Sequence, residues 1–543
     1  MCARPSGYDR LGLERGRFRL LGLALAALPS LLVCAQARAQ VLPSLPPLPP
    51  LPSLTVPAGP TPTLTPPATP IPSVAVPPPA SYEGAPATPH PIRGTGTVPQ
   101  NPFMAPNGES EIHDDGWQTD AYDWGGPLGK SPQTLSSYLA PGRDCGSIAF
   151  DSQGRVVSIC ISASGPELYM FDPHTLATLA TFSLPLRTPE DVLLNPNIFQ
   201  DFSNGGYFYL DNHDQVVTAT TTQHIYVIGE AAGGAGFALA HDYDLSSVLT
   251  QSEEITSALP DSNGLLWFVA RRDGVVGTLD LASGAVHVVR LGSGTDGEID
   301  NSFATDEHGG VYIATNRKLY RFGAGADDVP KIVWQVTYPN SGESKPGQVD
   351  DGTGSTPTVM PGGYVNITDN ADPMDVMVYR TAPRVRRRQV CRAPVFTAGA
   401  SANENSLMSA GRSMIVENNY GYQNPTSTEA GGVTAPGFAR VDLNRAGTGC
   451  RLVWTNWSER APTAVSKLST VDGLIYTYTK DPGSSDPWYW TAIDFRTGRT
   501  VYKQLAGTGV GYNNNYSGIA VSRAGTEYVG TLGGIIDVRD GPG

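Results

Sequence analysis

The chain has 543 residues and a formal net charge of −14, and glycine (61) and proline (47) are frequent. Such an acidic surface repels nucleic acid and anionic lipid, so we expect neither as a partner. The first 39 residues are typical of a secretory signal peptide, because arginines precede an apolar run and the small-residue site "ARA" precedes Gln40. We therefore expect an exported protein, periplasmic or extracellular. The apolar run is short and contains Pro29, so no transmembrane segment is expected.

Residues 40–106 are predicted to form a disordered, proline-rich linker. Positions 41–106 hold 22 of the 47 prolines and only two charged side chains, Glu83 and Arg93. Runs such as "LPSLPPLPPLPSL" lack the backbone donors that a helix or sheet needs, which favours an extended spacer. Two roles stay open: a spacer that holds the folded part away from a surface, or a leader without a partner.

Four cysteines follow the signal peptide, an even number that permits two disulfides in an exported protein. Cys145 and Cys160 flank a predicted hairpin, "CGSIAFDSQGRVVSIC", which favours their pairing. Cys391–Cys450 then follows by elimination. No CxxC or CxxCH motif occurs, so a cysteine zinc site or a covalent haem has no support.

Residues 107–543 are predicted to fold as a single, all-β propeller. The segments "SIAFDSQGRVVSI", "TSALPDSNGLLWFVA", "NSFATDEHGGVYIAT" and "SGIAVSRAGTEYVGT" share a plan of strand, glycine turn and strand. The units recur every 40 to 55 residues or so, which indicates four-stranded blades. We count eight, starting near 145, 190, 254, 301, 355, 405, 463 and 517, with seven as the alternative. The last unit has three strands, so a strand within 117–140 is expected to close the ring of a monomer.

The stretch "AIDFRTGRTVY" (492–502) lies at the third strand and turn of the seventh unit. It resembles the docking repeat of quinoprotein propellers, in which Ala, Asp, Thr-Gly and a terminal Trp hold neighbouring blades together. Tyr502 stands where that Trp would be. "MFDPHTLATLATFSL" is similar to the repeats of YVTN-type bacterial propellers. The resemblance implies a propeller fold and suggests pyrroloquinoline quinone as a cofactor, although the adjacent cysteine pair of many quinoprotein alcohol dehydrogenases is absent.

The inner strand of each blade should line a central channel, and its start should open onto one face. Carboxylates and amides gather at these starts, and their convergence predicts an oxygen-rich pocket for Ca²⁺ or a small polar ligand. The predicted metal ligands are Asp300, Asn301, Glu404 and Asn405. Lys467 is predicted to contact an anionic group, and Asp351 to serve as a catalytic base. The alternative is structural, since polar residues also begin inner strands because the channel is wet.

A second polar group comprises Asp369, Asn370 and Asp372 with Glu417, Asn418 and Asn419. These residues replace short turns and would bind a cation, rim the pocket or simply shape two loops; their spacing is not that of an EF-hand. The basic run "RVRRR" (384–388) is interpreted as a solvated strand or loop.

Two classes of function remain open. The first is a propeller enzyme acting on a small polar substrate, either a quinoprotein-like oxidoreductase or a metal-assisted hydrolase. The second is a non-catalytic propeller that binds a ligand or a protein, because propellers carry many unrelated functions.

Overall fold

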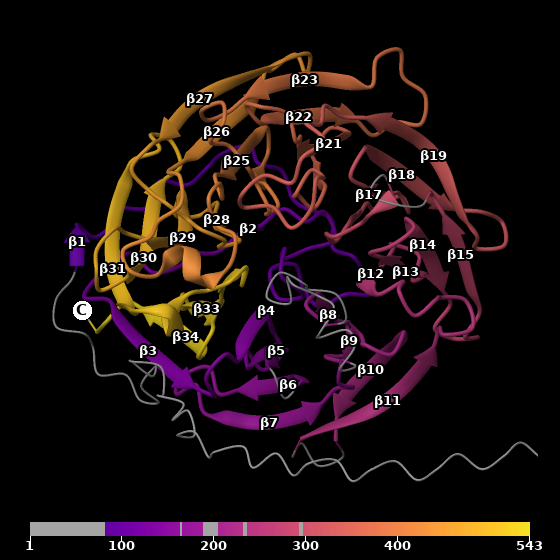
Figure 1. The fold of residues 1–543 in the computed structure, drawn as a ribbon, viewed down its shortest axis with the longest axis horizontal. Coiled ribbons are helices and arrows are strands. Elements are labelled where there is room, and N and C mark those ends of the chain that lie inside the picture. Colours follow the sequence, from indigo (N-terminus) through magenta and orange to yellow (C-terminus); the bar gives the residue numbers. More distant parts are fainter. Residues whose placement is uncertain (1–81, 163–164, 188–204, 232–235, 293–296, 543) are drawn as a thin grey trace, which may run out of the picture. The chain divides into compact units, whose positions relative to one another are not determined.

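The computed structural model describes residues 82–162, 165–187, 205–231, 236–292 and 297–542, which form a β-propeller of eight blades (Figure 1). The predicted all-β propeller and its count of eight are thus confirmed. The predicted signal peptide and residues 40–81 of the predicted linker lie outside the described residues. Within the described ranges, no helix is long and apolar enough to cross a membrane.

Each of the first four blades runs from an inner strand at the channel to an outer strand at the rim (Figure 1). Their strands are β4 (Asp144–Phe150), β5 (Val156–Ser162), β6 (Gly165–Phe171) and β7 (Thr178–Ser183); β8 (Phe208–Leu210), β9 (Val216–Ala219), β10 (His224–Glu230) and β11 (Phe237–Asp244); β12 (Ile255–Pro260), β13 (Leu266–Ala270), β14 (Val275–Leu279) and β15 (Val286–Arg290); β16 (Ala304–Thr305), β17 (Val311–Ala314), β18 (Lys318–Ala324) and β19 (Pro330–Thr337).

The last four blades follow the same order. Their strands are β20 (Thr358–Met360), β21 (Tyr364–Thr368), β22 (Asp375–Arg380) and β23 (Gln389–Pro394); β24 (Met408–Ala410), β25 (Ser413–Glu417), β26 (Phe438–Leu443) and β27 (Cys450–Asn456); β28 (Lys467–Ser469), β29 (Leu474–Lys480), β30 (Pro487–Asp494) and β31 (Thr500–Thr508); β32 (Ile519–Val521), β33 (Glu527–Thr531), β34 (Gly534–Arg539) and β3 (Gln133–Tyr138). Blade 7 gains two short strands, β1 (Tyr82–Gly84) outside and β2 (Ala121–Tyr122) inside. Two 3₁₀ helices, η3 (Pro425–Thr428) and η4 (Val510–Tyr512), lie in loops.

The glycine turns between first and second strands explain why the repeat was visible in the sequence. In blade 3, the Asp261 carboxylate accepts hydrogen bonds from the backbone N–H groups of Asn263 (2.8 Å) and Leu265 (3.2 Å). Gly264 has φ +91°, a conformation that disfavours any side chain. An aspartate followed three residues later by glycine therefore specifies a tight hairpin between two buried strands.

The ring is closed by the N-terminal strand β3, which pairs antiparallel with β34 and completes blade 8. This confirms the predicted closing strand and removes an exposed sheet edge. Both predicted disulfides are present: Cys145–Cys160 joins β4 to β5, and Cys391–Cys450 joins the outer strands of blades 5 and 6.

Neighbouring blades dock through aromatic side chains at the outer strands. The indole N–H of Trp454 in blade 6 donates to the carbonyl of Phe495 in blade 7 (2.9 Å). A Cβ on Gly498 would lie 2.5 Å from that indole ring, so only glycine permits this approach. Tyr502 in turn donates to the carbonyl of Pro127, next to blade 8 (2.8 Å). The stretch that resembled a docking repeat therefore does join blades in this protein.

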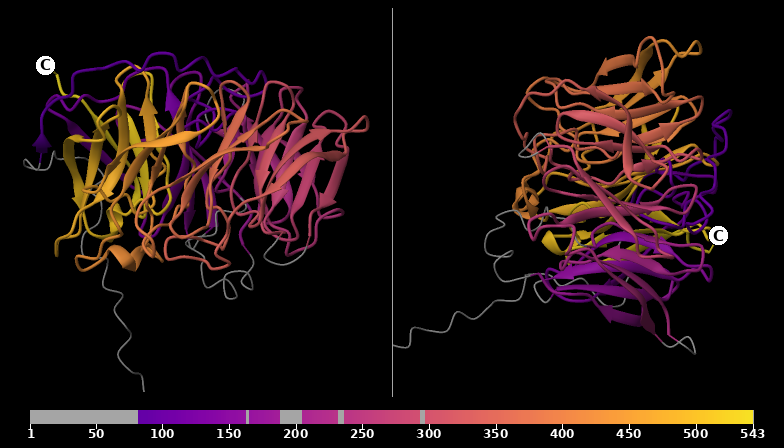
Figure 2. Two further views of the ribbon diagram at one scale, coloured as in Figure 1. Left: turned by 90° about the horizontal axis from the view of Figure 1, so that it is seen from above. Right: turned by 90° about the vertical axis from the view of Figure 1, so that its right-hand side faces the viewer.

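The segment before β3 lies along one face of the ring and enters its centre (Figures 1 and 2). We call residues 109–120 the plug. Its carbonyls accept hydrogen bonds from backbone N–H groups of inner strands in six blades, at distances between 2.6 and 2.9 Å: Phe150, Leu210, Thr305, Val359, Ser409 and Leu468. The plug thus occupies the channel between the inner strands.

Candidate functional site

A small pocket lies in the central channel against the plug. Ile112 and His113 of the plug contribute to its wall, and the remainder comes from residues near the starts of inner strands. Its volume is about 30 Å³, which is room for one or two waters or a metal ion. The other lining residues are Gly146, Gly206, Tyr207, Asp300, Asn301, Val349, Thr356, Glu404, Asn405, Ser406, Val465 and Tyr516.

All four predicted metal ligands line this one pocket. Asp300 and Asn301 precede β16 in blade 4, while Glu404 and Asn405 precede β24 in blade 6. They come together because each pair occupies the equivalent place in its blade, just before the inner strand. Asn301 hydrogen bonds to the Glu404 carboxyl and accepts from the Tyr207 hydroxyl (3.3 Å). Asn405 donates to the Ala464 carbonyl (3.0 Å) and to Glu417.

Asp300 also belongs to a cluster of three acidic side chains at the channel. One carboxylate oxygen from each of Glu298, Asp300 and Asp350 lies within 4.8 Å of the other two. Two arginines face the cluster: Arg271 Nε lies 2.6 Å from Asp300 Oδ1, and Arg272 NH1 lies 2.7 Å from Glu298 Oε1. The pairing is partial, since three carboxylates and the nearby Glu404 share two guanidinium groups.

Burial and neighbouring negative charges raise the pKa values of Glu298, Asp350 and Glu404. Burial raises the pKa of Asp350 to about 6, with the nearby Glu404 and Glu298 charges adding to the rise. Burial, then the charge of Asp300, raises the pKa of Glu298. The pKa of Glu404 lies well above its usual value, chiefly because its carboxyl is buried. The cluster therefore favours bound protons or a bound cation over bare negative charge.

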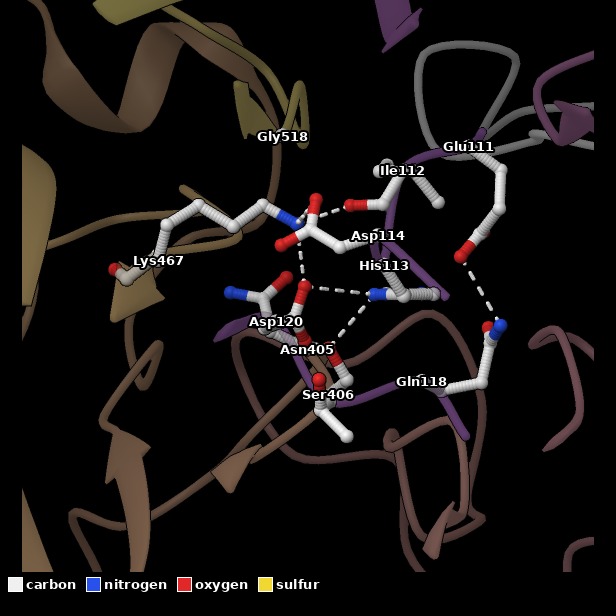
Figure 3. Close-up of polar contacts among 12 residues, drawn as sticks. Glu111, Ile112, His113, Asp114, Gln118, Asp120, Asn405, Ser406, Lys467 and Gly518 are labelled. Carbon is white, nitrogen blue, oxygen red and sulfur yellow. Dashed lines mark hydrogen bonds and ion pairs between the residues drawn. The ribbon is translucent and has the colours of Figure 1, made fainter. Parts of the chain in front are cut away.

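Asp351 and Lys467, the two predicted catalytic residues, are held elsewhere by ion pairs. Asp351 Oδ2 lies 2.7 Å from Arg317 NH2, and its other oxygen accepts from the Asn316 amide (2.7 Å). Lys467 is fully buried, and its ammonium points at the plug (Figure 3). Neither side chain is among the residues that line the pocket.

Lys467 anchors a buried polar network in the plug (Figure 3). Its Nζ lies 2.5 Å from Asp120 Oδ1 and 3.2 Å from Asp114 Oδ1, and it donates to the Ile112 carbonyl. Burial acts to raise the pKa of Asp120, but Lys467 and then His113 outweigh it and hold the pKa below its usual value. Burial raises the pKa of Asp114 well above its usual value. Asp120 is therefore the ionised partner of Lys467.

His113 links this network to the pocket. Its Nδ1 lies 3.2 Å from Asp120 Oδ1 and 2.8 Å from Ser406 Oγ, and its Nε2 lies 3.3 Å from Thr356 Oγ1. Both hydroxyl residues line the pocket. A histidine oriented by a carboxylate and facing hydroxyls is suited to moving protons.

The second predicted polar group shapes loops. Asp369 Oδ1 accepts from the backbone N–H groups of Asp375 (2.8 Å) and Ala371 (3.1 Å), and Asp372 accepts from Gly399 N–H (2.7 Å). The remaining side chains, Asn370, Glu417, Asn418 and Asn419, likewise bond to neighbouring loops or strands. These bonds agree with the structural interpretation of both loops.

Sequence reasoning missed Glu298 and the plug residues. Glu298 lies two residues before Asp300 in "GEIDNSF", so it belongs to the same segment as two of the predicted ligands, Asp300 and Asn301. "EIHDDGWQTD" (111–120) holds four acids and a histidine, but it lacks the repeat pattern, and only a closing strand within 117–140 was predicted near it. A dense run of acids outside the repeat was the available signal.

No family model matches the chain. An uncharacterized protein of Archaeoglobus fulgidus is 24% identical over 364 residues, which is 61% of this chain and 69% of that protein. Among solved structures, a europium-containing methanol dehydrogenase is similar with a TM-score of 0.49 and 11% identity, over 79% of this chain and 97% of that one. A streptogramin B lyase is similar with a TM-score of 0.39 and 10% identity, over 75% of this chain and 97% of that one. At these identities, similarity to a solved structure concerns the fold alone.

Proposed function

We propose that this protein is an exported, calcium-assisted enzyme that acts on a small polar substrate, of which only the reacting oxygen enters the small central pocket. The observation that carries the proposal is the convergence of Glu298, Asp300 and Asp350. Of these three, Asp300 lines the pocket, together with the buried carboxyl of Glu404. The two disulfides and the signal-like N-terminal residues support export.

Calcium suits this donor set better than other common ions. The cluster offers carboxylate oxygens, and Ca²⁺ takes six to eight oxygen ligands in flexible geometry. It contains no histidine or cysteine, the ligands that zinc prefers. Asn405 is the better suited of the two predicted amide ligands, because its NH2 group donates to Glu417 and Ala464 while its Oδ1 has no hydrogen-bond partner among the described residues. Asn301 Oδ1 already accepts from the Tyr207 hydroxyl.

The quinone suggested by the docking repeat does not fit the pocket. Sites for groups of that size have volumes of roughly 300–1,000 Å³, whereas this pocket has about 30 Å³. We therefore derive no step through pyrroloquinoline quinone.

The residues around the cluster provide proton transfer. Bound calcium would polarise an oxygen of the substrate and stabilise negative charge that develops there. Burial raises the pKa of the Glu404 carboxyl, and Glu404 would donate a proton to the oxygen that leaves as the acyl–oxygen bond breaks. Water would attack the acyl carbon of the substrate, and His113 would take up the proton of that water through Thr356 or Ser406. Lys467 positions the plug beneath these groups, and the pairing of Asp351 with Arg317 makes it a weaker candidate base.

Calcium binding is tested first, by thermal unfolding with and without Ca²⁺. We expect Ca²⁺ to raise the unfolding temperature of the wild type but not of Glu298→Gln/Asp350→Asn. Glu527→Gln is the matched control, since Glu527 is a buried carboxyl in blade 8 whose pKa burial also raises. It should keep the full shift. If millimolar Ca²⁺ leaves the unfolding temperature of the wild type unchanged, the proposed metal site is refuted.

Catalysis is tested separately in a pH-stat assay with δ-gluconolactone, a small hydroxyl-rich lactone whose reacting oxygen alone would enter the pocket. Calcium-dependent hydrolysis that Glu404→Gln abolishes, while the calcium shift survives, is the expected result. A protein that binds calcium and hydrolyses neither this lactone nor simple esters would be a calcium-binding propeller without hydrolase activity.

A further inference from the structure

A groove lined by arginines crosses the junction of blades 6 and 7, and its volume is about 650 Å³. Its walls are the segment 90–95 before the plug, the β24–β25 and β26–β27 turns, and the β30–β31 turn. Six arginines and one aspartate are among the residues that line it: Arg93, Arg412, Arg440, Arg445, Arg451, Arg496 and Asp442. We call this surface the arginine groove.

The groove reverses the charge balance of the chain. The whole sequence has 51 acidic against 37 basic residues, whereas the groove has six basic residues against one acidic residue. Placing several guanidinium groups on one surface lowers the stability of the folded protein, because these groups repel one another. Such a concentration in an acidic protein focuses a positive potential that attracts anions.

Four of the six guanidinium groups have no partner among the described residues. Arg440 is paired with Asp442 (2.8 Å), and Arg496 lies 3.5 Å from Asp494. The side chains of the other four make no hydrogen bond or ion pair within the described ranges, and all four are exposed: Arg93, Arg412, Arg445 and Arg451. Their donors are free to bind a ligand.

The groove is also built on rigid structure. Arg440 packs its guanidinium 3.9 Å from the Phe495 ring centroid and donates to the Phe495 carbonyl (3.1 Å), which ties the two blades together at the base. The segment 90–95 is fixed by backbone bonds, from His90 to Asp472 (2.7 Å) and from Ile92 to Thr470 (2.8 Å). Arg451 follows Cys450, whose disulfide anchors the start of β27.

We propose that the arginine groove binds a short, soluble polyanion that carries several oxyanion groups. Each guanidinium presents a planar fork of donors that matches a phosphate or carboxylate in two hydrogen bonds. The volume is that of a small-molecule site. A long polyanion or a membrane is disfavoured, because the negative charge of the rest of the chain would repel whatever extends beyond the groove.

The test is isothermal titration calorimetry of the purified exported chain with sodium tripolyphosphate, at 50 and 200 mM NaCl. We expect binding that weakens with salt, and an affinity at least about tenfold lower in Arg412→Gln/Arg445→Gln/Arg451→Gln. These side chains are exposed and unpaired, so the variant should fold, which circular dichroism checks. If the triple variant does not fold, the single variant Arg445→Gln replaces it, and we expect a smaller loss of affinity.

The matched control is Arg384→Gln/Arg386→Gln/Arg387→Gln, which removes three other exposed arginines from the 384–388 run. Its affinity should stay within about twofold of the wild type. A second titration uses citrate in place of tripolyphosphate. Binding of either anion that is lost in the groove variant supports the site. The anion that binds more tightly shows whether the groove prefers phosphate or carboxylate groups. No binding of either anion, an equal loss in the control, or binding only to phosphatidylglycerol vesicles or DNA would overturn the proposal.

Discussion

Replacing Lys467 with methionine isolates the energetic role of the buried ion pair under the pocket. Lys467 and Asp120 are both fully buried and 2.5 Å apart. Methionine fills most of the same volume, so the main loss is the ammonium, which leaves the Asp120 carboxylate with His113 and Ser406 as partners. Removing one partner of a buried pair costs about 3–5 kcal/mol. We expect a loss of that size in the free energy of unfolding at pH 7.

The measurement is guanidinium unfolding followed by circular dichroism. Adding Asp120→Asn to Lys467→Met should recover about 2 kcal/mol or more, because the second change removes the stranded charge. Lys331→Met, at an exposed lysine of β19, is the control and should change stability by less than about 0.5 kcal/mol. A Lys467→Met variant within about 1 kcal/mol of the wild type, or a double variant as unstable as the single one, would refute the reasoning.

Two further changes test buried charge and covalent closure. Burial raises the pKa of Glu417 from 4.5 to about 8, so its contribution to stability is complete below pH 4.5 and falls as the pH rises to 8. Glu417→Gln should therefore be more stable than the wild type at pH 9, by up to about 5 kcal/mol in the free energy of unfolding, and should unfold at a higher temperature there but not at pH 5. Equal differences at the two pH values would contradict this. Cys391→Ser/Cys450→Ser opens a loop of 59 residues and should cost about 4 kcal/mol in urea unfolding, and an unchanged midpoint would show that the disulfide does not stabilise the blades.

The fold was predictable because its determinants are local and repeated. An aspartate and a glycine three residues apart, as at Asp261 and Gly264, specify one hairpin, and the pattern recurs around the ring. Blade docking was visible for a similar reason, since "AIDFRTG" places Gly498 directly under Trp454 of the preceding blade. Each of these features depends on residues that are close in sequence or separated by one blade.

The site was only partly predictable because its contacts are distant in sequence. The topology of a propeller was enough to bring Asp300 and Glu404 together, since both precede inner strands. Nothing local indicates that Lys467 meets Asp120, 347 residues earlier, or that Ser406 meets His113, 293 residues earlier. The plug has no repeat to align with, so its place in the channel follows only from tertiary structure.

The N-terminal segment therefore has a greater role than its composition predicts. Six inner-strand N–H groups donate to plug carbonyls, and an unpaired buried N–H costs about 1–3 kcal/mol. Without the plug the inner strands would need water throughout the channel, and the pocket would lose the wall that Ile112 and His113 provide. The same segment places Arg93 in the arginine groove before it reaches the channel. One stretch of chain thus contributes to both an acidic pocket suited to a cation and a basic groove suited to an anion.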